Sequence, residues 1–384
     1  MNYSTIPTEI QELKAWSIAQ PYPEWKRINL PSDLFAQALE TPNVCVTGES
    51  SENSYFPMEI HSLEDSVSFP LDARVLKRLR ELRDLSIVKG IGNKFTSFAM
   101  THFNQGAMII GQPKQHTQIN VSHTLEGTNL VSHYLVYAPK NSKMEVIFDY
   151  REGEASSKLY SQVVLLAEPG SDVKLVNVQR LNAQTQSFQN IYALAEEGAQ
   201  VVIGDLQLGS DLKASNVYKR LEGHRTQGEI YTLYYTAEKA QADLSYTLNH
   251  VGKKTNGHIL SKGAMSKQSK KVFRGNLIFD TGATQSVSKE EEFCMLLADQ
   301  IKADSIPGLF CAEDDVIGEH AASIGQIDED RLFYLQSRGF SLTAARKLVI
   351  RGAYEEVLLK LNIPELTSNV QSTLDRLLES GREI

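Results

Sequence analysis

The segment 301–339 holds the side chains of this chain that are best suited to chemistry. It contains a thiol at Cys311 and an imidazole at His320, with the acidic run Glu313-Asp314-Asp315 between them. A neutral imidazole is an able ligand for iron, and cysteine thiolate is the usual ligand of iron–sulfur clusters. Small residues surround His320 and leave it accessible. His320 is therefore the sharpest candidate for a metal ligand in this chain, although the residues alone favour a structural hydrogen bond at a strand edge.

The remaining reactive side chains have structural explanations. Cys311 shares a strand face with Leu309, and Cys294 lies among large apolar residues in EEFCMLLADQ, so both thiols are expected to be buried. The acidic run lacks the spaced oxygen ligands and the glycine of a calcium loop, which favours a solvated turn. With Cys45 the chain has three cysteines and no Cys-x-x-Cys pair, which is typical of reduced thiols.

Composition and motifs exclude several classes of protein. The 384 residues are 41% hydrophobic and 22% charged, and no apolar run approaches the roughly 18 residues that cross a bilayer. The start of the chain lacks a basic, then apolar, targeting segment, so we expect a cytoplasmic protein without a membrane partner. Motifs for the hydrolysis of ATP, esters or peptides are absent from the sequence, which argues against an enzyme.

Charge is distributed unevenly along the chain. The net charge of -8 arises after residue 284, where acids outnumber bases, so a nucleic-acid partner is not expected. The stretch from Lys253 to Arg274 carries seven positive charges and no acid. Such a stretch is typical of a solvated strand face, on which lysines prevent sheet aggregation. A contact with an anion or a partner is the alternative.

Short alternating segments between about residues 95 and 282 predict many strands. Similar turns follow several of them, at Ala138, Ala167, Ala195, Ala237 and Asp280, in steps of 29, 28, 42 and 43 residues. These steps are multiples of a unit of about 14 residues, which suits half a coil of a solenoid. A β-helix therefore follows from the repeat, with a β-sandwich as the alternative on periodicity alone.

Helices are expected at both ends of the strand-rich region. Thr8 can cap an N-terminal helix, and 49–70 has the composition of a linker. Near the C-terminus, Asp328 can cap a helix 329–337 that Gly339 ends. Ser341 can then cap a second helix, and Pro364 can open a third. We therefore predict an N-terminal segment 1–75, a β-helix core 76–325 and a C-terminal helical subdomain 326–384.

The order of the C-terminal elements resembles the signature of the SufB/SufD family of iron–sulfur cluster assembly. That signature has an alanine-aspartate-x-x-proline turn, here 303–307, and an acidic strand. It continues with a His-x-Ala-[Ser/Thr] element, here 320–323, and a helix ending in [Phe/Tyr]-Tyr-Leu-x-Ser-Arg-Gly, here 333–339. The resemblance is clearest from about His250 to Leu361 and looser across the earlier strands.

This resemblance implies a fold, partners and roles for particular residues. The fold would be a right-handed parallel β-helix flanked by N-terminal and C-terminal helical segments. The protein would be a non-catalytic scaffold that pairs with SufB and binds the ATPase SufC through its C-terminal helices. No cofactor would be tightly bound, and a transient iron–sulfur cluster shared with SufB would form at His320. The residues expected to contact SufC are Leu332, Phe333, Tyr334 and Arg338.

Departures from the family pattern narrow the resemblance. Some members carry a cysteine two residues before the histidine, where this chain has Gly318. SufB proteins have a cysteine-rich motif in their N-terminal half and a glutamate after the histidine, where this chain has Ala321. These differences favour the SufD branch. A SufB-type scaffold and a carbohydrate-active β-helix enzyme remain the alternatives, and the isolated chain could pair with itself.

Overall fold

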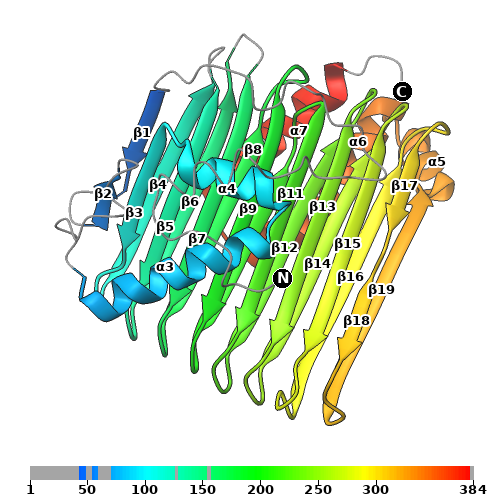
Figure 1. Cartoon of the computed structure of the whole chain (residues 1–384). Coiled ribbons are helices and arrows are strands. Elements are labelled where there is room, and N and C mark those ends of the chain that lie inside the picture. The colour runs from blue at the N-terminus through cyan, green and yellow to red at the C-terminus, as the bar shows by residue number, and fades with distance from the viewer. Residues whose placement is uncertain (1–42, 49–53, 59–70, 126–128, 154–156, 381–384) are drawn as a thin grey trace.

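The computed structural model describes residues 43–48, 54–58, 71–125, 129–153 and 157–380. Within them the chain forms a parallel β-solenoid of about seven turns, with helices at both ends (Figure 1). The expected N-terminal helix capped by Thr8 lies outside these residues, as does most of the predicted linker 49–70. The described part of that linker contains a short strand, β2.

Each coil contributes one strand to each of two facing sheets. In the described residues, the first sheet has the order β1 (Asn43–Thr47), β4 (His116–Leu125), β6 (Lys143–Glu152), β8 (Asp172–Arg180), β10 (Gln200–Gln207), β12 (Gln227–Thr236), β14 (Asn256–Met265), β16 (Ser286–Leu296), β19 (Val316–Gln326). The second sheet has the order β17 (Lys302–Ser305), β15 (Lys270–Phe279), β13 (Gln241–His250), β11 (Leu212–Leu221), β9 (Gln186–Ala195), β7 (Lys158–Ala167), β5 (Leu130–Ala138), β3 (Gln105–Ile110), β2 (Tyr55–Pro57), and β18 (Gly308–Cys311) also pairs with β15. Strands β3 to β19 pair in parallel, whereas β1 and β2 pair antiparallel with β4 and β3.

The turns explain the spacing found in the sequence. Ala138, Ala167 and Ala195 end β5, β7 and β9, at the edge where the chain passes from the second sheet to the first. Ala237 follows β12, at the opposite edge, and Asp280 follows β15 at the original edge. Steps of 28 or 29 residues therefore span one coil. Steps of 42 or 43 residues span three half-coils, which confirms the predicted unit.

A left-handed backbone residue recurs at the first of these edges. Asn141, Gly170, Gly198, Arg225 and Lys254 have φ of 58°, 71°, 64°, 57° and 57°. Positive φ is unfavourable for most residues and tolerated by glycine and asparagine. The turn conformation is thus repeated coil by coil even where the sequence supplies arginine or lysine.

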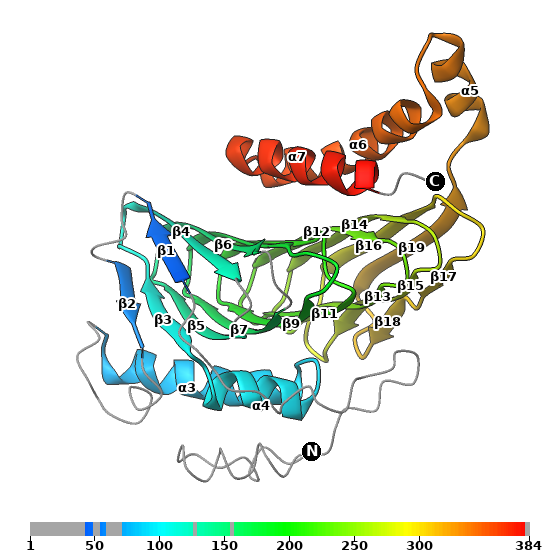
Figure 2. The same ribbon diagram turned by 90° about the horizontal axis from the view of Figure 1, so that it is seen from above.

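Three apolar clusters hold the structure together. One fills the interior between the two sheets. A second lies between the outer face of the second sheet and two helices, α3 (Ala73–Val88) and α4 (Asn93–Thr101). The third lies between the outer face of the first sheet and two others, α6 (Leu342–Leu361) and α7 (Pro364–Ser380). Figure 2 shows the two helix pairs on opposite faces of the solenoid.

The C-terminal helix boundaries agree with the sequence. Helix α5 (Glu329–Ser337) begins after Asp328, whose carboxylate accepts from two backbone N–H groups. Gly339 follows it with φ 95°. Ser341 caps α6, and Pro364 opens α7. Among the helices of the described residues, none is long and apolar enough to cross a membrane.

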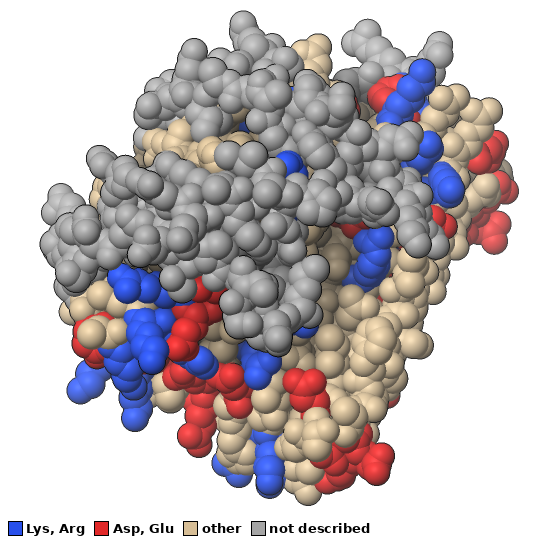
Figure 3. Space-filling view, viewed as in Figure 1, with Lys and Arg blue, Asp and Glu red and all other residues tan. Residues whose placement is uncertain are grey.

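Charged side chains also tie α3 to the solenoid. Figure 3 shows Lys and Arg gathered at the α3 end of this face, beside acidic side chains. Arg78 pairs with Glu222 at 2.5 Å, and Arg74 pairs with Glu168 at 3.2 Å. Both acids lie at solenoid turns, so these basic side chains are used in packing the helix.

Candidate functional site

The solenoid has two different ends. At its N-terminal end, β1 and β2 add antiparallel strands to β4 and β3. At the other end, β19 is the last strand of the first sheet, and the short β17 and β18 are the last strands of the second. No further strand pairs with these edges in the described part of the chain. We call β17, β18 and β19 the open end.

The open end exposes apolar side chains. Ile317 on β19 and Phe310 on β18 are each 57% exposed, and Ile324 and Leu309 are also exposed. A last coil has a neighbour on only one side, so residues that would be covered in a middle coil meet solvent here. Exposed apolar groups on an unpaired strand edge are typical of a surface that binds another chain.

His320 lies on β19 and faces the mouth of the solenoid. In β19, alternate residues point inward, because a Cβ at Gly318 would meet Leu309 and Phe279, and Phe279 belongs to the interior cluster. His320 shares this inward direction and pairs in register with Glu290 of β16. It is nevertheless exposed. The imidazole is therefore accessible at the open end, as its neighbours in sequence suggested, while its role as a ligand stays a prediction.

The two cysteines of this region differ in exposure. Cys294 on β16 is fully buried, and burial raises the pKa of its thiol. The prediction that Cys311 is buried is wrong, because it is exposed. Cys311 pairs in register with the interior residue Phe279, so the expected face is correct. Its coil is the last one, however, and nothing in the described residues covers that face.

A buried polar network lies beneath the open end. The ammonium of Lys271 is 2.5 Å from one Glu292 carboxylate oxygen and donates to the Ser305 hydroxyl at 2.9 Å. The Tyr234 hydroxyl donates to Glu292 at 2.7 Å, and Ser305 donates to its other oxygen. The Lys271 and Glu292 side chains are both 0% exposed. This network therefore satisfies an ion pair inside the solenoid.

Glu290 lies beside this network without sharing in it. Its side chain is fully buried, and neither carboxylate oxygen has a hydrogen-bond partner. Burial, followed by repulsion from Glu292, raises the pKa of Glu290 to about 8. Sequence reasoning missed Glu290, Glu292 and Lys271. Their signal was alternation, since each shares a strand face with interior residues.

The basic stretch 253–274 is corrected accordingly. Lys271 is buried in the interior, so a solvated strand face is wrong for this residue. Two others on the outside of the sheets are paired: Lys262 lies 2.9 Å from Glu356 of α6, and Arg274 lies 2.5 Å from Asp243. The acidic run 313–315, by contrast, forms the expected turn, where Glu313 accepts from the Gly282 N–H at 2.9 Å.

Helix α5 presents an apolar surface to solvent. Phe333 and Tyr334 are 73% and 57% exposed, and α5 has no buried residue. Arg338 is exposed and lies over the Tyr334 ring, 5.2 Å from its centre, while Leu332 is half-buried beside the cluster under α6. A groove of about 540 Å³ runs between α5 and α6, lined by Asp330, Arg331, Tyr334, Leu335, Leu348 and Val349.

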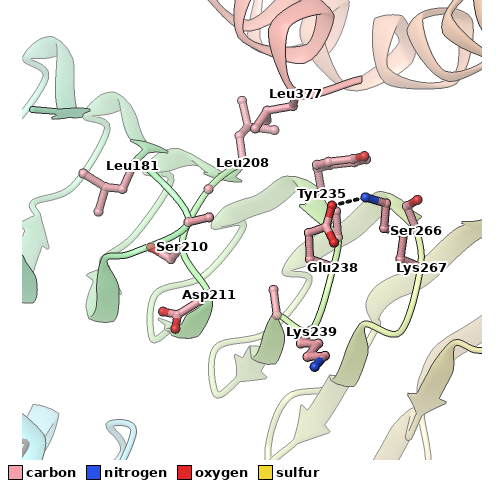
Figure 4. Close-up of a pocket in the computed structure, with 14 residues that line it drawn as sticks. Leu181, Leu208, Ser210, Asp211, Tyr235, Glu238, Lys239, Ser266, Lys267 and Leu377 are labelled. Carbon is pink, nitrogen blue, oxygen red and sulfur yellow. Dashed lines mark hydrogen bonds and ion pairs between the residues drawn. The ribbon is translucent and has the colours of Figure 1, made fainter. Parts of the chain in front are cut away.

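Another cavity, of about 390 Å³, lies at the solenoid edge that follows the first-sheet strands (Figure 4). Leu181, Leu208, Tyr235 and Leu377 of α7 line its apolar side. An ion pair between Lys267 and Glu238 lies within its wall. None of the residues predicted from the sequence to function lines this cavity.

The described residues contain no group of three or more His, Cys, Asp or Glu side chains placed to hold a metal ion. Among these residues, at most two such side chains could thus meet at one metal ion.

Comparisons with known proteins agree on one family. Residues 119–353 match the family described as "SUF system FeS cluster assembly, SufBD core domain". The "Iron-sulfur cluster assembly protein SufD" of Bacillus subtilis is 25% identical over 300 residues, which cover 75% of this chain and 68% of that protein. An "Iron-sulfur cluster assembly SufBD family protein" of Mycobacterium leprae is 23% identical over 289 residues, covering 72% of this chain and 73% of the relative.

Proposed function

This chain belongs to the SufBD family of iron–sulfur cluster assembly, and we propose that within it the chain is a SufD-type scaffold subunit without catalytic activity of its own. In this proposal it pairs with a SufB subunit, binds the ATPase SufC, and presents His320 where a transient cluster forms between the paired subunits. It works in the cytoplasm, without nucleic acid or membrane as a partner.

The asymmetry of the solenoid is the observation that carries the proposal. One end is closed by antiparallel strands, whereas β19 leaves an unpaired edge with Ile317 and Ile324 exposed. Unpaired edges of this length invite pairing with another chain. A partner solenoid with a similar end would extend both sheets and cover the exposed side chains. His320 would then lie at the junction, beside ligands that the partner supplies. When expressed alone, the chain could pair with itself through the same surface.

The α5 surface supports the contact with SufC. Phe333, Tyr334 and Arg338 are exposed to solvent on α5, and the groove beside α6 is lined mostly by apolar atoms. Large aromatic and arginine side chains are enriched in residues that dominate binding energy. Helix α5 connects the open end to α6, so a force applied there would reach β19 directly.

Co-purification tests both contacts. The tagged chain is expressed with a SufB and a SufC, and the retained subunits are quantified. The wild type should retain both. The Phe333→Ser/Tyr334→Ser double variant should lose most of the SufC while keeping SufB, because only the α5 surface changes. Ile317→Asp should lose SufB, because it places a charge in the strand interface.

Leu359→Ser is the matched control. Leu359 is 69% exposed on α6 and lies outside the α5 groove, so its replacement should change neither contact. If the wild type retains no ATPase subunit, the scaffold proposal is wrong. If all of the variants lose SufC equally, α5 is not its docking surface.

A further inference from the structure

One row of interior side chains changes character at the open end. Neighbouring strands of the first sheet place Ile119, Val146, Leu175, Ile203, Ile230 and Ile259 in register, all fully buried. The next two positions of the same row are Glu290 on β16 and His320 on β19. An aliphatic row is what stacked coils need for their core. The last two coils therefore replace core residues with a carboxylate and an imidazole.

Burying the Glu290 carboxyl group costs free energy, and no hydrogen bond or ion pair of Glu290 in the described residues compensates for it. An unpaired carboxyl group away from water is destabilising, and natural proteins rarely retain one without a reason. The neighbouring Lys271 is already held by Glu292 and Ser305. Both carboxylate oxygens of Glu290 are thus without a hydrogen-bond partner in the described residues.

The opposite sheet leaves space for this carboxyl group. Gly275 on β15 faces it, and a Cβ added at Gly275 would lie only 2.6 Å from the Glu290 carboxyl carbon and one of its oxygens. On β19, His320 has Gly318 and Ala322 as its inward neighbours, and these small residues leave space above Glu290 at the mouth of the solenoid. Neighbouring strands lie about 4.8 Å apart, so side chains paired across them can reach one bound ion.

We propose that Glu290 and His320 are the two ligands through which this chain holds ferrous iron at the open end. This inference rests on the proposed function and names the substrate that the site takes from solution. Imidazole nitrogen and carboxylate oxygen both suit Fe²⁺. Two ligands form only part of a coordination shell, which agrees with the absence of a three-residue metal group in the described chain. Water completes the shell in the isolated subunit, and SufB ligands complete it in the complex.

Cobalt binding to the isolated full-length protein tests the proposal. Co²⁺ serves as an air-stable probe for Fe²⁺, and its visible absorption reports the ligand set. The wild type should bind one Co²⁺ per chain. Glu290→Gln and His320→Ala should each weaken this binding at least tenfold. Glu319→Gln is the control, because it removes the carboxylate next to His320 that points to the outer face, and it should change affinity less than twofold. Equal affinity of Glu290→Gln and the wild type overturns the proposal.

Gly275→Ala provides a second variant that keeps both ligands. Its added methyl group displaces the Glu290 carboxyl, so Co²⁺ affinity should fall and the absorption spectrum should shift. If Glu290→Gln fails to fold, this variant decides, and unchanged affinity and spectrum in Gly275→Ala overturn the proposal.

Assembly of the complex separates this inference from the proposed function. Glu290→Gln should retain SufB and SufC like the wild type, while its complex accumulates several-fold less iron and sulfide. If the Glu290→Gln variant assembles normally and also binds Co²⁺ normally, the proposed iron site is wrong while the proposed function stands. Failure of the wild type to retain SufB or SufC removes the proposed function, whatever Co²⁺ does.

Discussion

Lys271 and Glu292 form an ion pair inside a solenoid whose interior is otherwise mainly apolar. Each charge has additional polar contacts, from Ser305 and from the Tyr234 hydroxyl. The Lys271 ammonium also lies 5.6 Å from the Tyr234 ring centre and 5.5 Å from that of Phe273. Buried pairs of this kind persist only when their remaining hydrogen-bonding groups are satisfied. The pair therefore connects β15, β16, β12 and β17 near the open end.

Replacing Lys271 with methionine should destabilise the protein strongly. The variant keeps the apolar volume of the side chain but leaves the Glu292 carboxylate buried without its cation. Breaking such a pair costs about 3–5 kcal/mol, which urea unfolding at pH 7 would measure. Lys271→Met/Glu292→Gln should recover most of the loss, because the neutral amide no longer needs the ammonium. If the double variant loses as much unfolding free energy as Lys271→Met, or more, then the broken ion pair is not the cause of the destabilisation.

At the residue scale, the sequence predicted the exposure of a residue within a motif but not the burial of charged residues outside it. The motif and its small neighbours identified His320 as accessible. Glu290 and Lys271 were missed because charged side chains are expected on a solvated surface, whereas both of these are buried. Alternation in KKVFRGNLIF places Lys271 on the same face as Phe273 and Phe279, so their shared interior direction was detectable. The unpartnered state of Glu290 was not detectable, because it depends on the opposite sheet.

At the scale of elements, the stacking of strands depends on close contacts at a few glycines. Gly263 on β14 pairs in register with Tyr234 on β12, and a Cβ at Gly263 would lie 1.8 Å from the Tyr234 ring. The ring thus covers the glycine of the next coil. Because the Tyr234 hydroxyl is held by Glu292, the ring cannot move aside without breaking the polar network.

Gly263→Ala should therefore destabilise the solenoid by about 1–3 kcal/mol, the usual cost of overpacking a dense interior. Gly325→Ala on β19 is the matched control, because a Cβ there meets nothing within 4 Å. The control should change stability by less than about 0.5 kcal/mol. Thermal unfolding of both variants measures the difference, and equal melting temperatures would contradict the role given to the Tyr234 ring.

The elements themselves were largely predictable, whereas their packing was not. Asp328, Ser341 and Pro364 mark helix starts by local chemistry, and the turn repeat gives the length of a coil. The outer faces of the strands were harder to assign. Strands such as β5 and β7 are buried on both faces, so the alternation that distinguishes inside from outside disappears. Which sheet each helix pair covers could not be predicted from local pattern.

At the scale of the whole molecule, several histidines are buried as neutral groups: His123 and His250 face the interior between the sheets, and His133 lies on the outer face of the second sheet beside Phe103. Burial lowers the pKa of His123, His133 and His250 to about 3 in each case. They lie on β4, β5 and β13, so the effect is spread along the solenoid. In the described residues, one ring nitrogen of His123, one of His250 and both of His133 have no side-chain or backbone hydrogen-bond partner, so no acceptor stabilises an added proton there.

Acid should therefore destabilise the protein well above the pH at which carboxylates protonate. The unfolded histidines titrate near pH 6.5, whereas the folded ones stay neutral to about pH 3, so the unfolded state binds more protons in this window and stability falls as pH falls. Glu290 acts in the opposite direction, because its raised pKa lets the folded state bind a proton first. The net loss between pH 6.5 and 5 should be about 3 kcal/mol. Urea unfolding at the two pH values measures it. His250→Gln removes one of the three groups and should reduce this loss by about 1–2 kcal/mol, whereas a loss of the same size in the variant would show that His250 does not contribute.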